Sequence, residues 1–194
     1  SALGMTALRI GDITGDGLPD VVLAAHRGVT VMPGIAGAGF GPEVRYSSNE
    51  FLTSMALSDV DQDGHLDVVA HGYLVGNVGR KHTLVFFNDG GALEPPLLLG
   101  ESTFNEPLDP YIGAGDFDGN GLPDLLAVVR NSGEMRRLLS ITWNLGSRRF
   151  SPPTSYGILG TVTEAKIGDV DRDGDLDIVA FQYSPQVGDA VAIG

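Results

Sequence analysis

The chain has 194 residues and no cysteine, and 25 acidic against 12 basic residues give it a formal net charge of −13. Without cysteine, disulfides, thiol catalysis and cysteine-zinc sites are excluded. The acidity argues against nucleic acid or an anionic membrane surface as a partner, because both need clustered Lys and Arg. No apolar run approaches ~18 residues, so no membrane insertion is expected.

The first repeat begins with a predicted strand in which Leu8 and Ile10 alternate with other residues. A nine-residue loop, 12–20, follows, and the apolar run 21–24 after it predicts a strand buried on both faces. A third strand is predicted at 29–32, and turn residues and a weaker fourth strand lead into the next repeat. Four antiparallel strands in each unit of about 50 residues predict an all-β fold, a β-propeller built from blades.

The loop recurs four times, at 12–20, 59–67, 116–124 and 169–177. Oxygen-bearing side chains occupy its positions 1, 3, 5 and 9, and position 6 is always glycine. So many carboxylates would repel one another without a hard cation, and Ca²⁺ takes roughly six to eight oxygen ligands. The loops therefore predict about four Ca²⁺ ions, one in each repeat. Position 2 is always apolar and is expected to turn inward: Ile13, Val60, Phe117 and Val170.

An EF-hand is the familiar alternative for such a loop. It needs a bidentate Glu at position 12 and a helix on either side. Position 12 is instead apolar in every copy: Leu23, Ala70, Ala127 and Ala180. The strand-like flanks and the missing Glu exclude the EF-hand.

The loops have the run Asp-[Ile/Val/Phe]-[Asp/Thr]-x-[Asp/Asn]-Gly-x-[Leu/Pro]-Asp, and a buried strand and a segment such as Phe40-Gly-Pro42 follow it. This pattern resembles the FG-GAP and VCBS repeats. Those repeats are the calcium-binding blades of integrin α-subunit propellers and of many bacterial secreted proteins. The resemblance implies that side chains at positions 1, 3, 5 and 9 and the backbone carbonyl at position 7 bind the metal. The ligands it implies are Asp12, Thr14, Asp16, Leu18 and Asp20; Asp59, Asp61, Asp63, His65 and Asp67; Asp116, Asp118, Asn120, Leu122 and Asp124; and Asp169, Asp171, Asp173, Asp175 and Asp177.

Two of the loops carry less ligand charge, because Thr14 and Asn120 are neutral oxygen donors. Affinity in calcium loops depends partly on the number of charged ligands. We therefore expect the second and fourth loops to bind more tightly than the first and third.

The whole of 1–194 is expected to form a single propeller region with repeats at 1–47, 48–104, 105–157 and 158–194, the last incomplete. Because the chain opens on Ser1 and shows no signal peptide, it is expected to be a processed or excised piece of a longer protein. Propellers close with about four to eight blades. The chain is therefore either a tight four-bladed ring that lacks a strand or an open fragment of a larger ring. We expect the open fragment, completed by further chain or by self-association as a homo-oligomer.

The predicted function is a calcium-stabilised binding or scaffold module of a secreted or cell-surface protein, with a protein or carbohydrate ligand. The alternatives are a lectin propeller and the propeller part of a secreted polysaccharide-degrading enzyme. No catalytic residue is predicted, because metal already accounts for every dense Asp cluster and the four histidines are scattered. His71 directly follows a buried strand and is expected to be structural.

Overall fold

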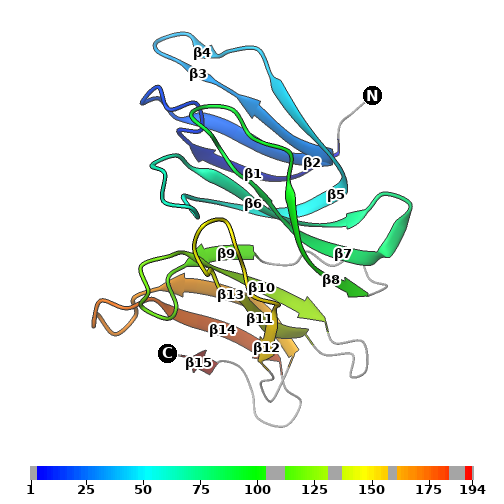
Figure 1. Cartoon of the computed structure of the whole chain (residues 1–194), viewed down its shortest axis with the longest axis vertical. Helices are drawn as coiled ribbons and strands as arrows, with labels where there is room; N and C mark the ends of the chain where they lie inside the picture. The colour runs from blue at the N-terminus through cyan, green and yellow to red at the C-terminus, as the bar shows by residue number, and fades with distance from the viewer. Residues whose placement is uncertain (1–3, 104–111, 131–136, 157–160, 184–190, 194) are drawn as a thin grey trace. The chain divides into compact units, whose positions relative to one another are not determined.

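The computed structural model describes residues 4–103, 112–130, 137–156, 161–183 and 191–193, and the chain divides into two compact units, Ser1–Asp109 and Pro110–Gly194 (Figure 1). The described residues form antiparallel strands and turns and contain no helix, which confirms the all-β prediction. Among them, accordingly, no helix is long and apolar enough to cross a membrane. The strands are β1 (Met5–Gly11), β2 (Asp20–Met32), β3 (Gly34–Ile35), β4 (Gly39–Phe40), β5 (Val44–Ser58), β6 (Asp67–Leu74), β7 (Asn77–Phe86), β8 (Leu97–Thr103), β9 (Ile112–Gly115), β10 (Asp124–Arg130), β11 (Arg137–Thr142), β12 (Thr154–Tyr156), β13 (Thr161–Gly168), β14 (Asp177–Tyr183) and β15 (Val191–Ile193).

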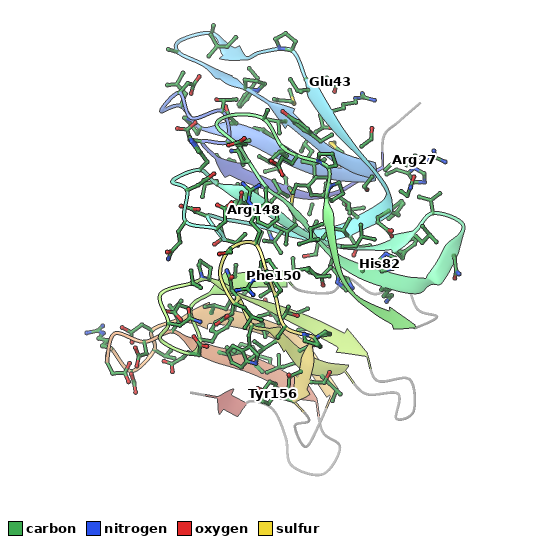
Figure 2. The ribbon with its side chains drawn as sticks, viewed as in Figure 1. Arg27, Glu43, His82, Arg148, Phe150 and Tyr156 are labelled. Carbon is green, nitrogen blue, oxygen red and sulfur yellow. The ribbon has the colours of Figure 1, made fainter. Side chains whose placement is uncertain are left out.

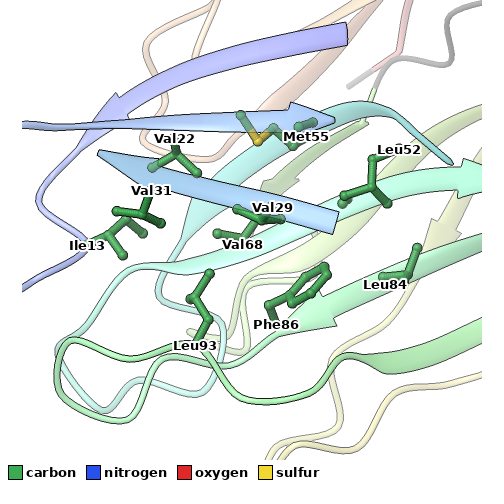
Figure 3. Close-up of a cluster of buried hydrophobic side chains, with 12 residues drawn as sticks. Ile13, Val22, Val29, Val31, Leu52, Met55, Val68, Leu84, Phe86 and Leu93 are labelled. Carbon is green, nitrogen blue, oxygen red and sulfur yellow. The ribbon is translucent and has the colours of Figure 1, made fainter. Parts of the chain in front are cut away.

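Unit 1 is built on a sheet with the order β1-β2-β5-β6-β7-β8, and the small hairpin β3–β4 adds a second sheet. Strand β2 contains a reversal of the chain. Its residues Arg27 and Gly28 have positive φ angles of 73° and 133°. Gly34 lies just after the last residue of β2, and its N–H donates to Oδ1 of Asp20, the first residue of β2, at 2.8 Å. If β2 were straight, its two ends would be about 40 Å apart. The third strand predicted at 29–32 is therefore the second arm of β2, and Figure 3 shows Val22 and Val29 on arms that run in opposite directions.

The reversal in β2 requires glycine at position 28. A Cβ built on Gly28 would lie 2.0 Å from the carbonyl oxygen of Tyr46 in β5. Because glycine alone has no Cβ and readily adopts positive φ, the turn can pack directly against the neighbouring strand.

Strand β5 belongs to two repeats. Its first part pairs with the second arm of β2, with Val44 opposite Val31 and Ser47 opposite Gly28. Its second part pairs with β6, from Glu50 opposite Leu74 to Ser58 opposite Asp67. The predicted fourth strand of the first repeat and first strand of the second are thus one continuous strand.

Unit 2 contains a four-stranded sheet in the order β9-β10-β11-β12 and a three-stranded sheet in the order β13-β14-β15. The four-stranded sheet is the arrangement predicted for a complete repeat. Part of the fourth predicted repeat, 158–194, lies outside the described residues.

Each unit has its own hydrophobic core. In unit 1 the core includes Ile13, the position 2 residue of the first loop, together with Val22, Leu52 and Phe86 (Figure 3). In unit 2 the core includes Leu126 and Val162, and Trp143 packs against it. The inward-facing Ile13 therefore fixes the first loop to the core, since full burial of an Ile side chain is worth about 1.5–3 kcal/mol.

His71 lies in β6 and is 3% exposed. Its Nδ1 is 3.3 Å from Oγ1 of Thr83. Burial, together with the charges of Lys81 and His82, lowers the pKa of His71 from 6.5 to about 3. A hydrogen-bonded, neutral imidazole supports the structural role expected for this residue.

The buried His71 should make stability depend on pH. From pH 6.5 down to about 3 the unfolded chain binds a proton at this side chain and the folded chain does not, so stability falls as pH falls. We expect His71→Gln to remove up to about 1.4 kcal/mol per pH unit of this slope. Urea unfolding between about pH 7 and about pH 5 measures it. The exposed His26→Gln is the control, and parallel curves for wild type and His71→Gln would contradict the prediction.

Candidate metal centre

Each predicted metal loop connects the first two strands of its repeat. The loops lie between β1 and β2, β5 and β6, β9 and β10, and β13 and β14. Position 9 is always the first residue of the second of these strands: Asp20, Asp67, Asp124 and Asp177. A ligand at this position is therefore held by the rigid sheet rather than by the loop alone.

The position 9 carboxylate ties the loop to the sheet. In the second loop, Oδ2 of Asp67 accepts the N–H of Val60 at 2.8 Å, and Oδ1 accepts the N–H of Asn88 at 2.8 Å. The same pattern joins Asp20 to Ile13 and Gly34, and Asp124 to Phe117 and Asn144. These three aspartates are fully buried. Their hydrogen bonds compensate part of the cost of burying a charge.

The position 1 carboxylate organises the loop backbone. Asp12 accepts the N–H groups of Gly15 and Asp16 on Oδ1 and of Gly17 on Oδ2, at 2.8–3.1 Å. A carboxylate has about four lone-pair sites, so these three bonds leave acceptor capacity for a cation.

The position 5 side chain holds the second half of the loop. Its oxygen accepts the N–H of position 7 in every copy, at 2.7–2.9 Å. These pairs are Asp16 with Leu18, Asp63 with His65, Asn120 with Leu122, and Asp173 with Asp175. The hydrogen bonds shape the turn around the glycine at position 6.

Positions 1, 3 and 9 converge in three of the loops. Each of the three carboxylates offers an oxygen, and these oxygens lie within 4.8 Å of one another. The three clusters are Asp59, Asp61 and Asp67; Asp116, Asp118 and Asp124; and Asp169, Asp171 and Asp177. Three such clusters could bind a metal ion, and an all-oxygen donor set is suited to a hard cation such as Ca²⁺.

Burial, and to a smaller extent the neighbouring carboxylates, shifts the protonation of two position 9 aspartates. The pKa of Asp67 is raised from 3.8 to about 6, chiefly by burial and also by the charges of Asp61 and Asp63, although the N–H groups of Asn88 and Val60 act to lower it. Burial also raises the pKa of Asp124. A bound cation would relieve this repulsion, because an opposite charge favours the ionised form.

The first loop has Thr14 at position 3, where the other three loops have aspartate. The Thr14 Oγ1 atom is buried and has no hydrogen-bond partner in the described part of the chain. Buried polar atoms are almost always satisfied. An unsatisfied oxygen at a predicted ligand position fits a calcium ion as its missing partner.

Comparison with protein families agrees with this geometry. A model of the FG-GAP-like repeat matches residues 12–70 and 116–180, which is more than half of the chain. The chain belongs to the FG-GAP-like repeat family. Each matched segment begins at position 1 of a loop and ends in the strand after the next loop.

A lectin from Agrocybe aegerita, whose structure describes recognition of non-reducing terminal N-acetylglucosamine, has a similar fold. The superposition has a TM-score of 0.65 at 22% sequence identity and covers 92% of this chain and 48% of the lectin chain. This chain thus spans about half the length of that lectin. A structure of BBS1N in complex with ARL6DN has a TM-score of 0.44 at 12% identity, over 100% of this chain and 67% of that chain. No match was found among curated proteins.

The FG-GAP-like loops place the predicted ligands as follows. Positions 1, 3 and 9 come together in the second, third and fourth loops. Coordination by position 5 and by the carbonyl at position 7 stays a prediction, as does the tighter binding expected of the second and fourth loops. The fourth loop differs at position 2, because Val170 is 62% exposed where Ile13 and Val60 are 1% exposed.

Two asparagines, Asn88 and Asn144, follow β7 and β11 in segments whose sequence predicts turns. Asn88 is fully buried, and its Nδ2 donates to the carbonyls of Ile13 at 2.8 Å and Leu66 at 3.0 Å. Asn88 therefore joins the first FG-GAP-like loop to the second. Asn144 is its counterpart in unit 2, and its Nδ2 donates to the carbonyl of Pro123 at 3.0 Å. The sequence signal for this role is that an Asn recurs just after the third strand in two of the repeats.

Proposed function

We propose that this chain is part of a calcium-stabilised β-propeller that recognises carbohydrate outside the cell. The observation that carries the proposal is the fold, which resembles a sugar-binding lectin over 92% of this chain. The FG-GAP-like repeats would be the blades, with one calcium ion in the loop between the first two strands of each. By analogy with that lectin, the proposed ligand is a glycan with an accessible terminal sugar such as N-acetylglucosamine.

In this proposal the calcium is structural rather than catalytic. The carboxylates at positions 1, 3 and 9 of each loop would hold it, with the Thr14 hydroxyl in place of a carboxylate in the first loop. Bound calcium would supply positive charge that keeps the loops folded against the sheet. The position 9 carboxylates support this role, because those of Asp20, Asp67 and Asp124 are buried and tied to backbone N–H groups. We therefore propose a binding protein rather than an enzyme.

An extracellular location suits such loops, because calcium is abundant outside cells and extracellular modules work with Kd values of about 10⁻⁴–10⁻³ M. This chain covers 48% of the lectin chain. We propose that further chain or a second copy completes the ring.

A glycan array probed with the labelled chain in calcium and in EGTA tests the proposal. We expect retention on glycans that end in one class of sugar, and loss of the signal in EGTA because the loops that support the sheets are destabilised. An array without any retained glycan in calcium would overturn carbohydrate recognition and leave a protein ligand as the alternative.

A further inference from the structure

Unit 1 contains a cavity of about 500 Å³ that lies away from the metal loops. Its lining includes the polar residues Ser48, Glu50 and His82 and the apolar residues Leu74 and Leu98. His82 is six residues before Asn88, which contacts the loops, so about 20 Å of strand separates them. Figure 2 shows His82 on β7 at the same end of unit 1 as Arg27.

Glu50 is the unusual residue of this cavity. It is 2% exposed, and its Oε1 lies 2.8 Å from Nδ1 of His82. Its other oxygen, Oε2, is buried and has no hydrogen-bond partner among the described residues. An unsatisfied buried carboxylate oxygen costs free energy, and native structures rarely retain one without a reason.

The surroundings hold Glu50 in place. The Oγ of Ser48 accepts the N–H of Glu50 at 3.2 Å, which fixes the backbone at the start of the second part of β5. The hydrogen bond with His82 links the Glu50 carboxylate, on β5, to β7. The Oε2 atom of Glu50 is thus a fixed acceptor without a donor among the described residues.

We infer that this cavity is a binding site for a neutral sugar, with a hydroxyl group of the sugar donating to Oε2 of Glu50. A sugar ring combines hydroxyl donors, one of which the unsatisfied Oε2 of Glu50 requires, with a C–H face that can pack on Leu74 and Leu98. The cavity volume of about 500 Å³ lies within the range of about 300–1,000 Å³ for small-molecule sites. This inference rests on the proposed carbohydrate recognition and names the pocket that performs it.

The test is titration calorimetry of N-acetylglucosamine, galactose and mannose against three variants in calcium. Glu50→Gln replaces the acceptor with a donor of the same shape. Leu98→Trp fills the mouth of the cavity at a residue that is 51% exposed and therefore tolerant of substitution. Glu43→Gln is the matched control, because Glu43 is an exposed carboxylate of unit 1 outside the cavity.

We expect Glu50→Gln and Leu98→Trp each to weaken binding of the preferred sugar at least tenfold and Glu43→Gln to leave it unchanged, with thermal melting confirming that the variants are folded. If Glu50→Gln fails to fold, Leu98→Trp alone decides the outcome. Sugar binding that neither pocket variant weakens would overturn this pocket and leave carbohydrate recognition standing. Absence of any sugar binding, on the array as well as in solution, would overturn both.

Discussion

Withdrawing calcium with EGTA should lower the melting temperature of this protein by roughly 20–40 °C. Each unit contains two of the four loops, and a ligand at 100 times its Kd stabilises by about 2.7 kcal/mol per site, or about 5 kcal/mol for two sites. A change of about 1 kcal/mol shifts the melting temperature of a domain of about 60–100 residues by roughly 4–8 °C. Differential scanning calorimetry in excess calcium and in EGTA measures the effect.

The physical reason is the crowding of anions that the fold imposes. Without a cation, three carboxylates in each of three loops bring oxygens within 4.8 Å of one another. Magnesium at the same ionic strength is the control. It screens the charges of the carboxylates as calcium does, but Mg²⁺ demands a tighter octahedral site and should replace calcium poorly in the loops. Identical melting temperatures in calcium and in EGTA would contradict a structural role for the metal.

The second large effect is expected at Asn88. Replacing Asn88 with Ala leaves the carbonyls of Ile13 and Leu66 without their donor in a buried site. An unsatisfied buried group costs about 1–3 kcal/mol, so the loss of both bonds should lower the unfolding free energy by roughly 2–6 kcal/mol. Urea unfolding of unit 1 measures the loss.

Asn88→Ala should also weaken metal binding at the first two loops and spare the other two. The side-chain Nδ2 that the substitution removes holds the carbonyl of Ile13 in the first loop and the carbonyl of Leu66 in the second. The neighbouring Gly91 adds to this contact, since a Cβ there would lie 2.8 Å from the Thr14 carbonyl oxygen. Asp89→Ala, an exposed change on the same turn, is the control. If both variants unfold at the same urea concentration, Asn88 does not join the loops as we describe.

The features that the sequence analysis predicted correctly depend on short stretches of chain. The loops, their strand flanks and the inward-facing Ile13 follow from spacing within about ten residues, where alternation and turn chemistry act directly. Val170 is exposed although its local sequence is like that of the buried Val60. The difference arises because burial depends on which other parts of the chain cover a residue. The propeller itself stays a prediction.

The features that sequence reasoning missed join residues that lie far apart in the chain. Asn88 and Ile13 are separated by 75 positions, and Glu50 and His82 by 32. An Asn in a turn and a Glu in a strand are ordinary residues locally. Only the pairing of the strands determines that one is buried between two loops and that the other is left with a free oxygen.

The continuous strand β5 means that the repeats of the sequence are not independent modules. The boundary between the first two repeats, at 47–48, falls inside β5, which spans Val44–Ser58. The strand cannot detach from one sheet without disturbing the other, so the first two repeats should unfold as one cooperative unit. A duplication or deletion of one repeat would also divide a strand, and it would preserve the fold only if the incoming segment restored both halves of that pairing.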